Sequence, residues 1–186
     1  MVEFIATMIM NDTVSNESII NEIVRRYPDP EERKMAINSS RPRTDGLNLL
    51  TCALSNRRRH DLVEFLMQSG ADPNWKTRNG THVLVFRSLH VQTDIDNLMT
   101  LLACGADPGA LSQGYSIIYD DLIYHRSKYQ PISQVLLTHG ASIAEEEYEI
   151  LRRRCRVNLN ALLDFHRRLS LRRIALHHVR LTVENL

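Results

Sequence analysis

Residues 70–80 read GADPNWKTRNG, and residues 105–109 repeat the start of that stretch as GADPG. Gly70, Gly105 and Gly140 are spaced at intervals of 35 residues, and each is followed by an alanine. A second series, Gly46, Gly80 and Gly114, follows at intervals of 34 residues. Two interleaved series with nearly the same period indicate a structural unit that is copied along the chain and stacked on its neighbours.

Within each unit the apolar residues follow the spacing of two short helices. In the first unit they are Leu49, Leu50 and Ala53, then Leu62, Val63, Leu66 and Met67. In the second they are Val83, Leu84 and Phe86, then Leu98, Leu101 and Leu102. In the third they are Ile117, Ile118 and Leu122, then Ile132, Val135, Leu136 and Leu137. We therefore expect each unit to run from glycine through two helices to the GA turn.

The GA turn has a predicted role for each of its residues. The glycine follows the last apolar turn of the second helix, where it can adopt the left-handed conformation that ends a helix. The alanine is small enough to lie beneath the next unit, and the acid that follows can accept hydrogen bonds from backbone amides of the turn.

The segments on either side of the units also have helical patterns. Ile5, Met8 and Ile9 share one face, and Ile19, Ile20, Ile23 and Val24 share another before Pro28-Asp29-Pro30. Ser15 to Ser18 supply N-cap residues for the second of these helices. The apolar start lacks a basic n-region, so we interpret it as a helix and not as a signal peptide. At the other end, Glu145–Glu147 and Arg152–Arg154 suit the two ends of one helix dipole.

This pattern resembles the ankyrin repeat, whose units end in GAD and open with a glycine before TPLH. The resemblance implies an all-α ankyrin-repeat solenoid with three repeats over 44–143, a divergent capping repeat over 1–43 and C-terminal helices over 144–186. The TPLH positions hold NLLT (48–51), HVLV (82–85) and SIIY (116–119). Because the usual Thr/His hydrogen-bond pair is absent, we expect packing to hold the first helices instead.

The resemblance implies protein binding through the hairpin tips and the first helices on a concave face. The candidate residues are Trp75, Lys76, Arg78 and Asn79, because tryptophan and arginine are frequent binding anchors. Alternatively, Trp75 packs over a neighbouring hairpin. The run Arg57-Arg58-Arg59-His60 could meet an acidic partner or a nucleic-acid backbone, but we interpret it as a solvated face.

The segment SLRRIALHHVR (170–180) places apolar residues on one side of a basic helix. It resembles the first half of a SOCS box, an elongin-binding element whose pattern is SLxxLCxxxIR. The resemblance assigns elongin contacts to Leu171, Ile174, Ala175 and Val179, within a box at 170–183. Alanine stands at the usual cysteine, and the proline-containing second half does not follow. The alternatives are a helix that caps the stack, or a surface for nucleic acid or an anionic membrane.

Charge and composition exclude several classes of function. The net charge is +1, yet residues 1–150 carry −6 and residues 151–186 carry +7, from nine arginines against Asp164 and Glu184. Three widely spaced cysteines and unclustered histidines predict no metal site, and no catalytic or cofactor motif occurs. We expect no enzyme, no cofactor, no membrane span and no nucleic-acid partner, and a cytoplasmic or nuclear location.

Two functional hypotheses follow from these observations. The first is an adaptor that holds a target protein on its repeats while 157–183 docks elongin B/C of a cullin ubiquitin ligase. The second is a stand-alone ankyrin inhibitor or scaffold that masks a partner's surface, as the inhibitors of NF-κB do. Small ankyrin proteins of viruses and intracellular bacteria are often similar to this chain in their divergent motifs and few repeats.

Overall fold

The computed structural model describes residues 2–41, 44–86, 91–125, 130–154 and residue 168. These residues are mostly helical. In chain order the elements are α1 (Val2–Met10), α2 (Asn16–Arg26), α3 (Pro30–Ile37), α4 (Leu49–Leu54), α5 (His60–Gln68), the 3₁₀ turn η1 (Val83–Val85), α6 (Val91–Ala103), β1 (Leu111–Ser112), β2 (Tyr115–Ser116), α7 (Ile117–His125), α8 (Gln130–Thr138) and α9 (Glu145–Arg154). The strands β1 and β2 form a two-residue antiparallel hairpin.

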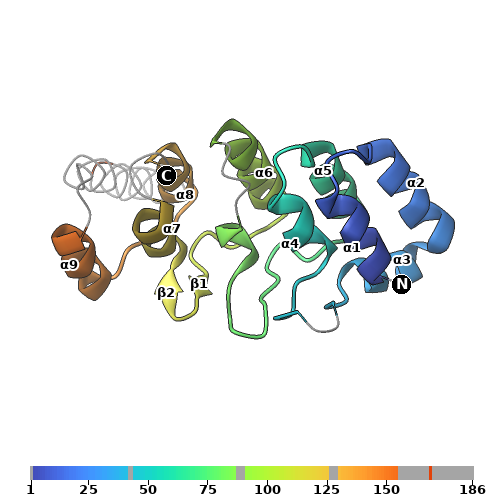
Figure 1. Ribbon diagram of the computed structural model, residues 1–186. Helices are drawn as coiled ribbons and strands as arrows, with labels where there is room; N and C mark the ends of the chain where they lie inside the picture. Colours follow the sequence, from blue (N-terminus) through green and yellow to red (C-terminus); the bar gives the residue numbers. More distant parts are fainter. Residues whose placement is uncertain (1, 42–43, 87–90, 126–129, 155–167, 169–186) are drawn as a thin grey trace, which may run out of the picture.

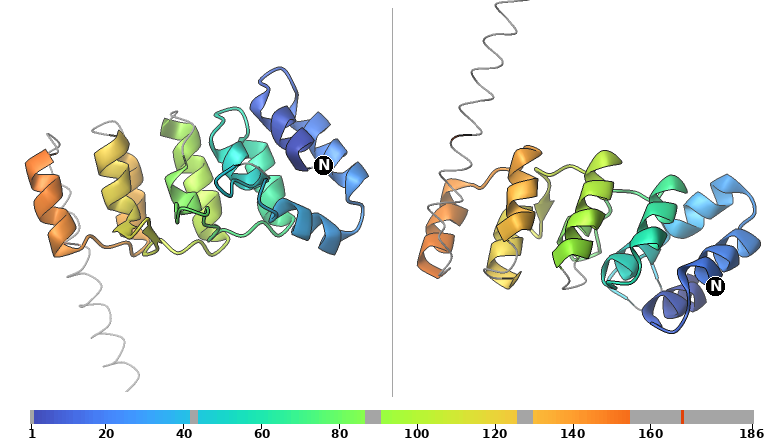
Figure 2. Two further views of the ribbon diagram at one scale, coloured as in Figure 1. Left: turned by 60° about the horizontal axis from the view of Figure 1, so that its bottom comes forward. Right: turned by 90° about the horizontal axis from the view of Figure 1, so that it is seen from above.

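The helices stand in two layers along a row (Figures 1 and 2). One layer contains α1, α4, η1, α7 and α9, and the other contains α2, α5, α6 and α8. The pairs α1/α2, α4/α5 and α7/α8 contact each other across the layers. The connecting hairpins run along one edge of the row, at the bottom of Figure 1. The predicted all-α class is thus confirmed, with little strand in the described part of the chain.

The predicted apolar faces meet in one core between the layers. All seven apolar residues named for the first unit are buried, as are Ile5, Ile9, Ile19 and Ile23 of the N-terminal pair. The second unit differs, because its expected first helix is a single 3₁₀ turn, η1, within the described residues. Val83 and Leu84 are nevertheless fully buried. A short turn is therefore enough to deliver the apolar contacts of that unit.

The GA turns have the predicted geometry. Gly70, Gly105 and Gly140 have φ values of +86°, +89° and +107°, in the left-handed region. In all three, the alanine amide donates to a carbonyl in the last turn of the preceding helix, as Ala71 does to Leu66 at 3.0 Å. Each alanine is at most 6% exposed. The Asp72 carboxylate accepts a hydrogen bond from the backbone N–H of Asn74 at 2.8 Å, so the acid stabilises the turn as predicted.

Successive turns are linked by asparagine side chains that sequence analysis did not identify. The Asn38 amide group donates to the Gly70 carbonyl at 2.8 Å, and its Oδ1 accepts from the Asp72 backbone N–H at 2.8 Å. Asn74 makes the same pair of bonds one unit later, to the Gly105 carbonyl and the Asp107 N–H. We call this arrangement the asparagine clamp. The next equivalent position holds Gly109, which has no side chain with which to clamp the turn at 140–142.

The interpretation of Arg57–His60 as a solvated face is wrong for Arg59, which is 2% exposed. Its guanidinium donates to the Ile9, Asn11 and Val14 carbonyls at 2.9, 2.6 and 2.7 Å. It also bonds to Oδ1 of Asn16 at 2.9 Å, at the start of α2. Burial lowers the pKa of Arg59, with an opposing contribution from Asp12. The cation holds the end of α1 and the loop to α2, where helix carbonyls favour positive charge.

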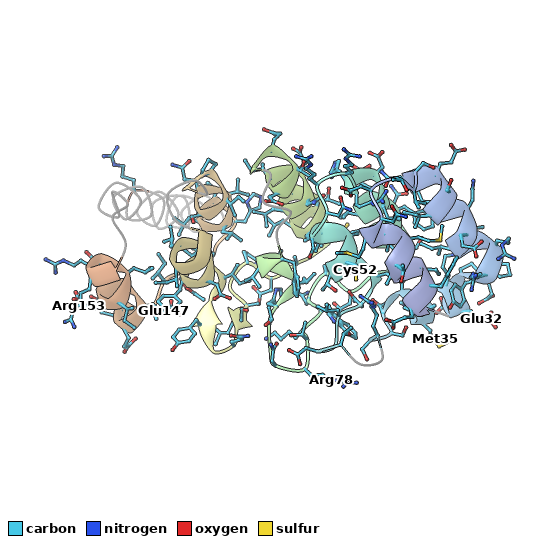
Figure 3. All side chains as sticks on the ribbon, in the orientation of Figure 1. Glu32, Met35, Cys52, Arg78, Glu147 and Arg153 are labelled. Atoms are coloured by element: carbon cyan, nitrogen blue, oxygen red, sulfur yellow. The ribbon has the colours of Figure 1, made fainter. Side chains whose placement is uncertain are left out.

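Two further capping features fix the ends of the row. Pro28-Asp29-Pro30 does end α2, but it also begins α3, a helix missing from the sequence analysis, because the Asp29 carboxylate caps its first amides. At the other end, Glu147 of α9 is 6% exposed. It accepts from the Ser116 hydroxyl at 2.6 Å and from the Ala144 amide at 3.1 Å. Glu147 therefore ties the start of α9 to the start of α7, and Figure 3 places it between them.

Replacing Arg59 by methionine is expected to destabilise the protein by about 3 kcal/mol or more, because several buried carbonyls lose their donor together. The measurement is the free energy of unfolding by urea denaturation. The matched control is Arg57→Met at an exposed position, for which we expect a change within about 0.5 kcal/mol. Equal effects of the two substitutions would contradict the role given to Arg59.

Replacing Gly109 by asparagine is expected to extend the asparagine clamp to the third GA turn and to raise the free energy of unfolding by about 1 kcal/mol. The backbone φ of Gly109 is not in the left-handed region, and an added Cβ would meet only Oδ1 of Asp107, at 3.3 Å. Gly109→Ala is the control, since it has the same backbone effect without the amide. If the two variants are equally stable, the clamp does not transfer to this turn.

Candidate protein-interaction surface

The hairpins along one edge of the row are joined to one another by backbone hydrogen bonds. The Arg78 N–H donates to the Asp45 carbonyl at 2.9 Å, and the Gln113 N–H donates to the Gly80 carbonyl at 3.0 Å. Gly46 approaches so closely that an added Cβ would lie 2.8 Å from the Arg78 nitrogen. The hairpins thus form a continuous ridge joined by backbone hydrogen bonds, and its outward side chains are the ones available to a partner.

The four predicted hairpin residues fall into two pairs. Trp75 is half-buried, and its indole Nε1–H donates to the Gly46 carbonyl at 2.9 Å. Asn79 accepts from the Thr81 N–H at 3.1 Å, which closes the turn. Lys76 and Arg78 are exposed, and Figure 3 shows Arg78 at the outer edge of the ridge. Trp75 and Asn79 hold the hairpin together, whereas Lys76 and Arg78 present positive charge to solvent.

The residues that begin the first helices are hydrogen-bonded caps, so the expectation that packing alone holds these helices is wrong. Asn48 and Thr51 form a reciprocal capping box, with the Thr51 N–H donating to Oδ1 of Asn48 at 2.9 Å. At the equivalent positions, His82 Nδ1 accepts from the Leu84 N–H and the Ser116 hydroxyl accepts from the Tyr119 N–H, both at 3.2 Å. Each side chain satisfies an N–H that a helix start leaves unpaired.

His82 is a fully buried titratable group beside the ridge. Burial is the main cause that lowers its pKa to about 4, and the nearby Lys76 ammonium acts in the same direction. At neutral pH the imidazole is therefore uncharged, which leaves Nδ1 free to accept the Leu84 bond.

The third hairpin exposes apolar and aromatic side chains that sequence analysis did not select. Leu111 is 51% exposed and Tyr115 is 45% exposed. Tyr115 stacks on Tyr119 of α7, with ring centroids 4.6 Å apart. The strand alternation in LS and YS, with one residue of each pair outward, was the signal that could have identified them.

The remaining predicted groups lie elsewhere or outside the described residues. Leu171, Ile174, Ala175 and Val179, assigned to elongin binding, lie outside the described residues. Cys52 is buried beside Arg41, whose guanidinium lies 3.4 Å from Sγ, and burial raises the pKa of the Cys52 thiol despite that contact. Cys104 is exposed just after α6.

Within the described ranges, no group of three His, Cys, Asp or Glu side chains is arranged to hold a metal ion. The same part of the chain contains no helix of the length and apolar character needed to cross a membrane.

Comparison with known proteins identifies one of the repeats. Residues 45–78 match the family model of the ankyrin repeat. The match begins next to Gly46 and ends at Arg78, so it covers the first unit inferred from the glycine spacing. A search of curated proteins finds no significant match to the chain. The chain therefore contains an ankyrin repeat, a type of unit that is typically a non-catalytic protein-interaction domain.

Lowering the pH from 7 to 4 is expected to destabilise the protein through His82. Its folded-state pKa, about 4, lies below the unfolded value of 6.5. As the pH falls through 6.5, the His82 imidazole binds a proton in the unfolded chain but not in the folded protein. The free energy of unfolding therefore decreases until the pH reaches about 4. The full effect is roughly 3 kcal/mol at most.

The matched variant is His82→Asn, which introduces the capping residue of position 48 and removes the titration. Urea denaturation at several pH values should give a smaller loss of stability in this variant than in the wild type, whatever its stability at pH 7. Parallel pH profiles would rule out His82 as the source.

Proposed function

We propose that the chain is a non-catalytic adaptor of the ankyrin–SOCS-box kind. Its repeats over 44–143 bind a target protein, and residues 157–183 dock elongin B/C of a cullin ubiquitin ligase. The observation that carries the binding half is the hairpin ridge, which uses its own backbone groups internally and presents Lys76 and Arg78 outward. Exposed cations on a rigid frame suit a protein partner with acidic surface groups.

A continuous ankyrin solenoid is the architecture that best accounts for this surface. The helix pairs stand in a row, and Asn38 and Asn74 join successive GA turns by the same two bonds. Identical linkage at a repeat-length interval is what nearest-neighbour stacking requires. The matched repeat at 45–78 would then be followed by two divergent copies.

The elongin half of the proposal rests on the apolar positions of SLRRIALHHVR. A helix that places Leu171, Ala175 and Val179 on one side can insert them into a groove of a partner. The position of α9 supports a docking role for the segment beyond it. Because α9 already packs on α7 and is tied to it through Glu147, the third unit has a covering helix before residue 157.

The second candidate is a stand-alone ankyrin inhibitor or scaffold, in which residues 157–183 complete the cap. The observation in its favour is the half-buried Ile150 on α9, an apolar residue that further chain could cover. In both candidates the setting we propose is the cytoplasm or the nucleus, since Cys52 and Cys104 are free thiols.

Co-expression with elongin B and C, followed by size-exclusion chromatography, tests the adaptor. We expect a stable ternary complex with the wild-type chain and none with Leu171→Asp, because a carboxylate cannot enter an apolar groove. The melting temperature of the isolated variant should stay within about 2 °C of the wild type. The matched control is Leu186→Asp, which lies after the proposed docking segment 157–183 and should retain binding.

Separate elution of the wild-type chain and elongin B/C would reject the adaptor. If Leu171→Asp then also lowers the melting temperature, residues 157–183 belong to the cap and the stand-alone binder is the better description.

A further inference from the structure

A pocket lies where α9 faces the third hairpin, and neither half of the proposed function uses it. It is partly open to solvent and has a volume of about 360 Å³, and the described residues that line it are Tyr115, Tyr119, Ile150 and Arg153. Pockets of this size fall in the range that encloses small ligands or the side chains of a bound segment. The pocket draws on three elements, β2, α7 and α9, so its shape depends on the contact of the third unit with α9.

The two tyrosines form a preorganised aromatic wall. Tyr119 is held in α7 and is only 8% exposed, whereas Tyr115 on the hairpin is 45% exposed. Their rings stack at 4.6 Å with an interplanar angle of 18°. Because Tyr119 supports one face of Tyr115, an incoming apolar side chain would find a rigid surface and would cost little conformational entropy.

Arg153 supplies positive charge at the same pocket. It lies three residues after Ile150 on α9, so the two side chains share a helix face. The carboxylates of α9 nearest to it have other partners, since Glu149 pairs with Arg152 at 3.7 Å and Glu147 with Ser116. Among the side chains that the structure describes, none forms an ion pair with Arg153. Its guanidinium is therefore available for a carboxylate from outside.

The charge of the chain favours an acidic ligand at this end of the row. From residue 151 onward the chain carries nine arginines against two acids, whereas the preceding residues are net negative. Near the pocket, the described part of α9 has the exposed cations Arg152 and Arg153. Their positive charge attracts acidic segments and repels basic ones, in the manner of steered association.

We propose that this pocket binds an acidic–apolar segment of a protein partner. A large apolar or aromatic side chain of that segment packs against Tyr115 and Ile150, and a neighbouring Asp or Glu carboxylate accepts hydrogen bonds from Arg153. Aromatic packing and charge-assisted hydrogen bonding then act on adjacent residues of one ligand. The inference rests on the proposed protein-binding function and narrows it to a partner chemistry.

The test is selection of short random peptides displayed on phage against the full wild-type chain, followed by fluorescence anisotropy with the enriched peptides. We expect enrichment of peptides with Asp or Glu within three residues of an aromatic or large aliphatic residue. Tyr115→Ala and Arg153→Gln should each weaken their binding about tenfold. Arg57→Gln, which removes an exposed arginine from the loop between α4 and α5, is the control and should leave binding within about twofold. All variants should keep the wild-type circular dichroism and melting temperature.

Charge reversal gives a second readout that a purely structural role of Arg153 would not produce. Selection against Arg153→Glu should enrich peptides in which Lys or Arg replaces the acidic residue. The opposite pattern is that the enriched peptides lose binding in Lys76→Glu and Arg78→Glu but keep it in Tyr115→Ala and Arg153→Gln. That result would overturn the pocket proposal and leave protein binding by the ridge standing. If neither surface enriches any peptide, the pocket proposal fails together with target binding by the repeats.

Two other occupants of the pocket are distinguishable in the same experiment. Peptide binding that occurs only after Asp164→Asn and Glu184→Gln would mean that the chain's own acidic residues occupy the pocket. A concentration-dependent dimer that Arg153→Gln abolishes would mean that a second copy does. Either result overturns the proposal.

Discussion

The structure depends on how one GA turn is held against the next. A left-handed glycine ends each second helix, and the buried alanine after it sets the spacing to the neighbouring unit. The asparagine clamp then binds both the carbonyl and the amide of the turn from the preceding unit. A shift in register would break these hydrogen bonds, each of which contributes about 1 kcal/mol. The clamp therefore specifies the register as well as contributing stability.

The repeat and its turns were predictable because they depend on local chemistry. The turn glycine, the helical periodicity and the acid after the alanine each determine the structure of residues close to them in the sequence. The described structure has all three features. Arg59 and Asn38 were not predictable in this way. The bonds of Arg59 reach 43 to 51 residues along the chain, and those of Asn38 reach 32 to 34 residues. Nothing local distinguishes the buried Arg59 from its exposed neighbour Arg57. Helix α3 was missed because Pro-Asp-Pro was interpreted only as a stop, although Asp29 also caps a start.

The candidate surface was partly predictable for the same reason. The sequence located the hairpin at 74–79, yet it did not separate residues that brace the hairpin from those that face solvent. Trp75, the strongest candidate by residue type, donates its indole N–H to Gly46, 29 residues away, whereas Lys76 and Arg78 have their side chains exposed. Tyr115, Tyr119, Ile150 and Arg153 come together only when α9 packs on α7, so no local pattern could identify them as one site.

Internally hydrogen-bonded polar side chains and exposed cations have different roles in this chain. Arg59, Glu147 and the clamp asparagines are saturated by internal partners, and they fix the α1–α2 loop, the α7–α9 contact and the turns between units. Lys76, Arg78 and Arg153 come from the same rigid elements but keep their charges in solvent. Cations held on such elements lose little freedom when a partner binds, so recognition at these positions costs less conformational entropy than recognition by a flexible loop.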